Sequence, residues 1–264
     1  MKKQKVLFVV PYVLWLFLFV LAPLFLIVYE AFTNQAGHFS FSNLLTVAGN
    51  GIFLKMMLNS FSYALVITLV TGLISYPLAY IVSRLKNQQL WLLLIILPTW
   101  INLLLKTYAF IGIFSSHGLI DNFLHLFGIG PVQFLFTDFS FIVVASYIEI
   151  PFMVLPIYDS IKGIDPALLE AAADLGASRK QTFTRVIWTL SLPGVKAGVQ
   201  AVFIPSLSLF MITRLIGGNK VITLGTAIEE YFLTTMNWHL GSMIGVILIL
   251  LMVLTLLLTN SKEN

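Results

Sequence analysis

The residues best suited to chemistry in this chain are carboxylates that interrupt apolar sequence. Glu149 lies within the apolar run from Phe141 to Leu155, and Asp138 lies 11 residues earlier. On a helix that interval separates two side chains by about 20°, so both acids can share one face. A lone carboxylate in hydrocarbon costs at least ~2.5 kcal/mol, and it therefore normally faces a water-filled cavity or pairs with a cation. A stripe of such acids could guide a cationic solute.

Aromatic and polar side chains accompany these acids. Tyr147 and Tyr158 are also 11 residues apart, and their rings could bind a cation through cation–π contacts. We therefore predict a pathway for a flexible polycation in which Glu149 makes weak ion pairs. The alternative is a structural ion pair between Glu149 and Arg214 that holds two helices together. The remaining pathway candidates are Arg214 itself and three residues near the outer end of the apolar run 87–105, namely Trp100, Asn102 and Tyr108. Packing at the membrane interface is the alternative explanation for the two aromatic residues among them.

A second group of acids lies on a short predicted helix between two apolar blocks. Asp165 can cap its first amides, Pro166 suits its first position, and Gly176 lets the chain break off. Glu170 and Asp174 project from one side, four residues apart. The residues at i, i+3, i+4 and i+7 form an apolar stripe, which consists of Leu168, Ala171, Ala172 and Leu175. This combination favours docking to a partner with a basic groove, and the alternative is an ordinary solvated loop helix.

The elements that must position these residues are membrane spans. Hydrophobic residues make up 59% of the 264 positions, charged residues make up 10%, and the mean hydropathy is +0.96. A soluble domain of this size could not cover its surface with so few charges, so we expect a membrane protein. The absence of cysteine excludes disulfides, thiolate catalysis and Cys-ligated metal sites. The net charge of +4 suits basic cytoplasmic loops better than nucleic-acid binding.

Six apolar runs are long enough to cross a bilayer, which needs about 20 residues of helix. They predict an all-α membrane protein with six transmembrane helices near residues 6–29, 56–83, 87–105, 139–161, 193–213 and 231–261. Lys2, Lys3 and Lys5 precede the first run, so the positive-inside rule and the even number of spans place both termini in the cytoplasm. The first run is longer than a secretory signal core, and we interpret it as a retained anchor. We expect one transmembrane domain, 1–264, with a cytoplasmic loop at about 162–190.

Catalytic and metal-binding motifs are absent from the sequence. No G-x-x-x-x-G-K-[ST] phosphate loop is present, and the four histidines have no metal-ligand spacing. Neither an H-E-x-x-H nor a G-x-S-x-G motif occurs. We therefore expect a non-catalytic chain with no catalytic residue, no metal site and no cofactor of its own.

The segment Glu170–Ser178 resembles the EAA loop of ABC-importer permeases, in which E-A-A is followed after three residues by Gly. The matching residues here are Glu170, Ala171, Ala172 and Gly176. The resemblance implies a type I ABC importer permease fold and a loop of two short cytoplasmic helices that seats in a groove of an ATPase subunit. ATP and magnesium would bind in that partner. Ser178 and Gln181 form a predicted capping box for the second helix.

Most of the chain is similar to the PotB-type permeases of spermidine/putrescine importers, through Pro151–Val154, Gln181–Phe183 and Leu215–Gly218. The similarity implies half of a polyamine pathway in the bacterial plasma membrane. The implied partners are lipid, a second, PotC-like permease, a dimeric PotA-like ATPase, a PotD-like extracytoplasmic receptor and the polyamine. Arg214 replaces an acid that is common in these relatives, and it would repel a polyamine unless neutralised. The alternatives are an ABC permease for an amino acid or an anion, and an ion-coupled transporter that uses Glu149.

Overall fold

The computed structural model describes residues 2–34, 36–130 and 132–260, which form helices and their connections. The predicted all-α class is confirmed. In chain order the helices are α1 (Lys2–Leu16), α2 (Ala22–Ala31), α3 (Ser42–Gly49), α4 (Gly51–Val82), α5 (Gln88–Ile96), α6 (Leu103–Phe114), α7 (Leu119–His125), α8 (Asp138–Lys162), α9 (Pro166–Asp174), α10 (Arg179–Thr182), α11 (Trp188–Ser206), α12 (Met211–Ile216), α13 (Leu224–Glu229) and α14 (Trp238–Asn260). Short π or 3-10 turns are η1 (Phe17–Leu21), η2 (Leu97–Trp100), η3 (Phe183–Ile187), η4 (Gly218–Lys220) and η5 (Glu230–Thr234).

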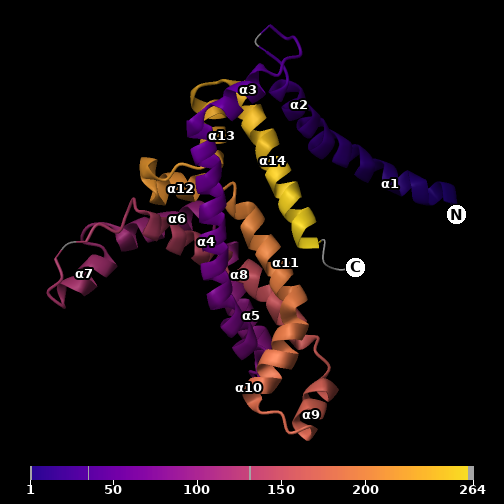
Figure 1. The fold of residues 1–264 in the computed structure, drawn as a ribbon, viewed down its shortest axis with the longest axis vertical. Coiled ribbons are helices and arrows are strands. Elements are labelled where there is room, and N and C mark those ends of the chain that lie inside the picture. Colours follow the sequence, from indigo (N-terminus) through magenta and orange to yellow (C-terminus); the bar gives the residue numbers. More distant parts are fainter. Residues whose placement is uncertain (1, 35, 131, 261–264) are drawn as a thin grey trace.

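Within the described residues, six helical segments are long and apolar enough to cross a membrane, which is the number that the sequence predicts. Their bounds are Val9–Ala31, Gly51–Val82, Leu103–His125, Asp138–Lys162, Arg179–Ser206 and Trp238–Thr259. Figure 1 shows α3 and α13 at one end of the molecule and α9 and α10 at the other. The long helices α4, α8 and α11 run between these ends, so the two ends lie on opposite sides of any membrane that the bundle crosses.

The prediction of one span at 87–105 is wrong. The chain forms a shorter apolar helix over Gln88–Trp100, and α6 then starts anew after Asn102. The Asn102 side chain accepts a hydrogen bond from the Leu104 amide at 2.8 Å, which is an N-cap. Ile101 has an extended backbone with φ −78 and ψ 134, so the preceding helix cannot continue through it. A helix cap therefore divides an apolar run that has the composition of one helix.

The fifth span also differs from its prediction at 193–213. It begins at Arg179, because the cap at Ser178 starts a helix that continues without a break, and it ends at Ser206. Beyond it the Ser208 amide donates to the Pro205 carbonyl at 3.0 Å in a closing turn. Hydropathy locates the apolar sequence, whereas caps and turns locate the ends of the helix.

The centre of the bundle is α8, which packs between α4 and α11. Two glycines of α11 allow its backbone to approach α8 closely. A Cβ added at Gly194 would lie 2.4 Å from the Pro156 carbonyl oxygen, and one added at Gly198 would lie 2.6 Å from Met153 Sδ. Small residues at a contact between helices are the usual way to pack them tightly in a membrane. The bundle is therefore a tightly packed connection between its two ends.

The helices α1 and α2 extend away from this bundle (Figure 1, indigo). The α2 helix packs along α14, whereas α1 makes its contacts with the π turn η1 that joins it to α2. Phe19 and Phe25 are 66% and 67% exposed in the monomer. In a bilayer such side chains contact lipid or a neighbouring subunit.

Candidate functional site

The predicted helix over residues 165–176 is confirmed as α9. Asp165 accepts a hydrogen bond at 2.9 Å from an amide of the first turn. At the other end the Ala177 amide donates to the Ala172 carbonyl at 3.0 Å, which is the long bond of a Schellman motif. Gly176 adopts φ +76, where a residue with a Cβ is strained. Both ends of α9 are therefore fixed by residues that are its neighbours in sequence.

The second predicted helix of the loop is the first part of the fifth span instead of a separate element. The Gln181 amide donates to Ser178 Oγ at 3.3 Å and the Ser178 amide donates to Gln181 Oε1 at 2.8 Å, so the predicted capping box is confirmed. From this cap the helix continues through α10, the π turn η3 and α11 to Ser206. A displacement of the loop beyond α9 thus acts directly on a helix of the bundle.

The outer face of α9 is free. Leu168 is 48% exposed and Leu175 is 87% exposed, and Glu170 and Asp174 are exposed beside them. No residue of α9 is buried in the monomer. An apolar stripe with flanking carboxylates, left uncovered by its own chain, is suited to a protein partner that supplies apolar surface and cations.

The other face of α9 attaches it to the bundle. Leu169 and Ile164 pack against the main hydrophobic core. A cavity of about 220 Å³ beneath α9 is lined by Tyr80 and Arg84 of the α4 end together with residues of α8, α9 and η3. The Arg84 guanidinium lies over the Tyr80 ring, 4.5 Å from its centroid. The ends of α4, α8 and α9 therefore meet at one place.

The two predicted pathway acids have separate surroundings. Glu149 is buried in the middle of α8, 5% exposed, and the cation that interacts with it electrostatically is Lys106 of α6. Asp138 is exposed at the first residue of α8 and accepts a hydrogen bond from the Tyr63 hydroxyl at 2.8 Å. The two acids lie on the same helix, but one is buried and the other exposed, and each interacts with a different residue.

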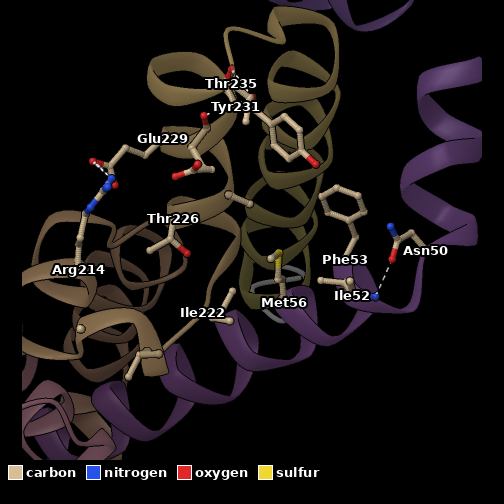
Figure 2. Close-up of a pocket in the computed structure, with 14 residues that line it drawn as sticks. Asn50, Ile52, Phe53, Met56, Arg214, Ile222, Thr226, Glu229, Tyr231 and Thr235 are labelled. Atoms are coloured by element: carbon tan, nitrogen blue, oxygen red, sulfur yellow. Dashed lines mark hydrogen bonds and ion pairs between the residues drawn. The ribbon is translucent and has the colours of Figure 1, made fainter.

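Arg214 does not pair with Glu149, so the alternative of a structural Glu149–Arg214 pair is wrong. Its Nη1 lies 2.9 Å from Glu229 Oε1, and the two side chains face each other in Figure 2. Arg214 lies within α12 and Glu229 ends α13, with the turn η4 between the two helices. Arg214 is thus neutralised locally, by a carboxylate from the next helix of the chain.

Comparison with known proteins identifies the family, although no family model matches. The chain is 36% identical over 259 residues to the spermidine/putrescine transport system permease protein PotB of Escherichia coli (strain K12), which covers 94% of each chain. PotB of Haemophilus influenzae is 35% identical over 249 residues, covering 91% of this chain and 87% of that protein. The chain belongs to the PotB permease family. It is a permease subunit, and it is a multi-pass protein of the bacterial inner membrane.

Solved structures show that the permease has the predicted fold. It superimposes with a TM-score of 0.85 and 19% identity on a chain of a bacterial alginate ABC transporter in complex with an alginate pentasaccharide-bound periplasmic protein. The match covers 100% of the permease and 95% of that chain. A second structure of a bacterial ABC transporter involved in alginate import gives a TM-score of 0.79. The ABC importer permease fold is therefore confirmed.

Tyr147 and Tyr158, which are predicted to line a pathway with Glu149, lie in different surroundings. The Tyr158 hydroxyl donates to Gln88 Oε1 at 2.9 Å in the core near the α4–α5 turn, at the α9 end of the permease. Tyr147 is 39% exposed and packs edge-on against Phe110, with 5.0 Å between ring centroids. These contacts assign Tyr158 to the packing near α9 in the monomer.

The candidates near the third span lie on the surface of the permease. Trp100 and Tyr108 are 74% and 58% exposed, which fits packing against lipid or another subunit. Asn102 is used as the cap of α6. Among the residues that the structure describes, no group of three or more His, Asp and Glu side chains could hold a metal ion.

Sequence reasoning missed a cavity of about 360 Å³ at the end opposite α9. Glu229, Glu230 and Tyr231 line it together with Arg214 and with Phe53 of α4 (Figure 2). The signal available in the sequence was the Glu-Glu-Tyr triplet at 229–231, which alone resembles any polar loop. Its cavity arises because the start of α4 and the α12–η5 segment, far apart in sequence, pack together.

Proposed function

We propose that this permease forms half of the translocation pathway of an ATP-driven importer whose substrates are spermidine and putrescine. The observation that carries the proposal is the 36% identity to PotB across 94% of both chains. The exposed α9 helix supports an ATP-driven machine, since an ion-coupled transporter would leave an uncovered apolar stripe without a use. The substrate class rests on the relatives.

Coupling proceeds through α9. A dimer of separate ATPase subunits binds ATP and magnesium and receives α9 in a groove, while the permease itself hydrolyses nothing. Leu168, Ala171, Ala172 and Leu175 set the depth of docking, and Glu170 and Asp174 orient it against basic side chains. Gly176 permits the turn into the next helix. Closure of the ATPase dimer then displaces α9, and the displacement reaches α8 through Leu169 and α11 through the continuous helix from Arg179.

The α9 end is the cytoplasmic end, and both termini are cytoplasmic. Its cations support this orientation, because the α4–α5 turn, the end of α8 and the start of α10 carry Arg84, Lys86, Lys162, Arg179 and Lys180. A second, non-identical permease completes the pathway, and a polyamine-binding receptor docks at the opposite end. Inside the bundle the buried carboxylate of Glu149 pairs with a passing ammonium group during transport.

Uptake of labelled spermidine by cells that express the complete transporter tests the proposal. Unlabelled spermidine and putrescine should compete, whereas phosphate and neutral amino acids should not. Competition by phosphate or by an amino acid in place of polyamines would contradict the proposed substrate class. Uptake that persists without any ATPase subunit would contradict the proposed energy source.

A further inference from the structure

The cavity at the end opposite α9 is built from three separated segments. Asn50 and Phe53 come from the start of α4, Arg214 comes from α12, and Glu229 and Glu230 come from the junction of α13 with η5. Its volume is about 360 Å³. Its charged lining residues are two glutamates and one arginine, so the cavity has an excess of negative charge.

One of the two oxygens of the Glu229 carboxylate lacks a donor. Glu229 Oε1 pairs with Arg214 Nη1 at 2.9 Å, but Glu229 Oε2 is buried and has no hydrogen-bond partner among the described residues. An ionised carboxylate offers about four acceptor positions, and burying it without donors is unfavourable. The Glu229 side chain is 15% exposed, whereas that of Arg214 is 50% exposed. The acid is thus held in the wall while its cation remains accessible to exchange.

Aromatic rings form the neighbouring part of the wall. The centroids of the Tyr231 and Phe53 rings lie 5.9 Å apart with their planes tilted by 34°, and the rings are neighbours in Figure 2. Such rings bind both the methylene groups and the charged nitrogen of an alkylammonium chain. Tyr231 lies within the π turn η5, and π turns are frequent at binding sites. A surplus of carboxylate beside paired rings suits an alkylammonium group better than an anion or a zwitterion.

From this geometry we infer that the cavity is an entry subsite for one terminal ammonium group of the polyamine. Arg214 is the resident cation, meaning the cation that occupies Glu229 while the substrate is absent. An arriving ammonium donates to Glu229 and Glu230 and displaces the guanidinium, and its methylene chain lies against Tyr231 and Phe53. The inference rests on the proposed function, and it assigns to the extracytoplasmic end of the permease a site for the substrate itself.

An exchange of cations has a signature that a structural ion pair lacks. If the pair only held α12 to α13, Arg214→Gln and Glu229→Gln would weaken the permease alike, and the double variant would recover. If Arg214 competes with the substrate, the two single variants shift spermidine affinity in opposite directions. Arg214→Gln should tighten binding about threefold, and Glu229→Gln should weaken it about tenfold, because a charge-assisted hydrogen bond is lost.

Equilibrium dialysis of labelled spermidine against the purified, receptor-free complex of both permeases and the ATPase dimer measures these shifts. Glu230 is exposed and makes no ion pair among the described residues, so replacing it should cause no folding defect. Glu230→Gln should weaken spermidine binding about threefold. Lys220→Gln is the matched control, since Lys220 is an exposed cation of the adjacent turn that does not line the cavity, and it should leave affinity unchanged.

The outcomes separate this inference from the proposed function. Loss of affinity in both Arg214→Gln and Glu229→Gln, or no change in any of the three cavity variants, overturns the entry subsite while spermidine uptake by the wild type still supports the importer. A wild-type complex that neither binds nor imports spermidine overturns both. Opposite shifts at Arg214 and Glu229, with Lys220→Gln unchanged, support the exchange of cations.

Discussion

The two ends of the permease use carboxylates in opposite ways. At the α9 end Glu170 and Asp174 are exposed, unpaired in the structure's described residues and carried on a helix whose ends are fixed by sequence neighbours. At the other end Glu229 is held in a cavity wall and paired with Arg214 across a turn. A short helix with free acids suits a rigid protein partner, whereas a cavity with an exchangeable cation suits a small charged solute. The bundle of α4, α8 and α11 joins the two.

The largest expected effect is a charge reversal at the α9 end. In the proposed docking, Glu170→Lys places a cation against basic side chains of the ATPase groove. Juxtaposed like charges cost several kcal/mol, so about 2 kcal/mol or more of docking energy is lost. The ATPase should no longer co-purify after mild detergent extraction, and spermidine uptake should fall more than tenfold. Glu170→Gln is the matched control and should lose less. An ATPase that still co-purifies in normal amount with Glu170→Lys would show that α9 does not dock through this acid.

Substitution of the buried acid Glu149 tests whether the helix bundle also binds the cationic substrate during transport. Glu149→Gln should reduce uptake about tenfold, because a passing ammonium group loses its ion pair within the membrane. Removing Lys106 as well, in Glu149→Gln/Lys106→Met, should not restore uptake. Recovery in this double variant would mean that the Glu149–Lys106 interaction only holds α6 to α8, and would limit the recognition of substrate to the outer cavity.

The connection between the two ends depends on the contact of α11 with α8. Gly194→Ala would place a Cβ 2.4 Å from the Pro156 carbonyl oxygen, and overpacking of this kind costs about 1–3 kcal/mol. The thermal stability of the purified complex should fall together with uptake. Gly112→Ala in α6 is the control, since no atom lies within 4 Å of the added Cβ, and it should be neutral or slightly stabilising. Equal behaviour of the two variants would argue against a tight α8–α11 contact.

The smallest effect concerns the turn after α9. Gly176→Ala has space for its methyl group but must adopt φ +76, which costs about 1–2 kcal/mol for a residue with a Cβ. Spermidine uptake should fall a few-fold while the amount of permease in the membrane is unchanged. Gly176→Asn should be milder, because Asn tolerates this conformation. Identical uptake by Gly176→Ala and the wild type would indicate that α9 works without its Schellman end.

The difference between the two ends also explains what the sequence could predict. The caps of α9, its apolar stripe and the capping box at Ser178 follow from residues within a few positions of one another, and the structure confirms each of them. The number of apolar spans followed from composition, but the break at Asn102 did not, because one polar side chain decides whether a helix ends within an apolar run or continues through it.

Tertiary pairing lay beyond sequence reasoning. Arg214 pairs with Glu229 because a turn returns α13 to α12, whereas the sequence alone left Glu149 as an alternative partner. Tyr158 follows Tyr147 by 11 residues, the same interval that separates Asp138 from Glu149. Its hydroxyl nevertheless donates to Gln88, which lies 70 positions away in another helix. Helical periodicity predicts on which face of its helix a residue lies, whereas its contacts in other helices depend on how the helices pack together.

Cross-linking from α9 tests the central claim most directly, because the chain has no native cysteine. Leu175→Cys, at a position that is 87% exposed on the free face of α9, should form a cross-link to the ATPase subunit in inside-out membrane vesicles. Leu45→Cys, at a position that is 71% exposed at the opposite end, should form none. The account predicts that ATP changes the yield of the Leu175 cross-link. A Leu175→Cys thiol that is labelled from outside intact cells, or that never reaches the ATPase in a transporter that still imports spermidine, would contradict it.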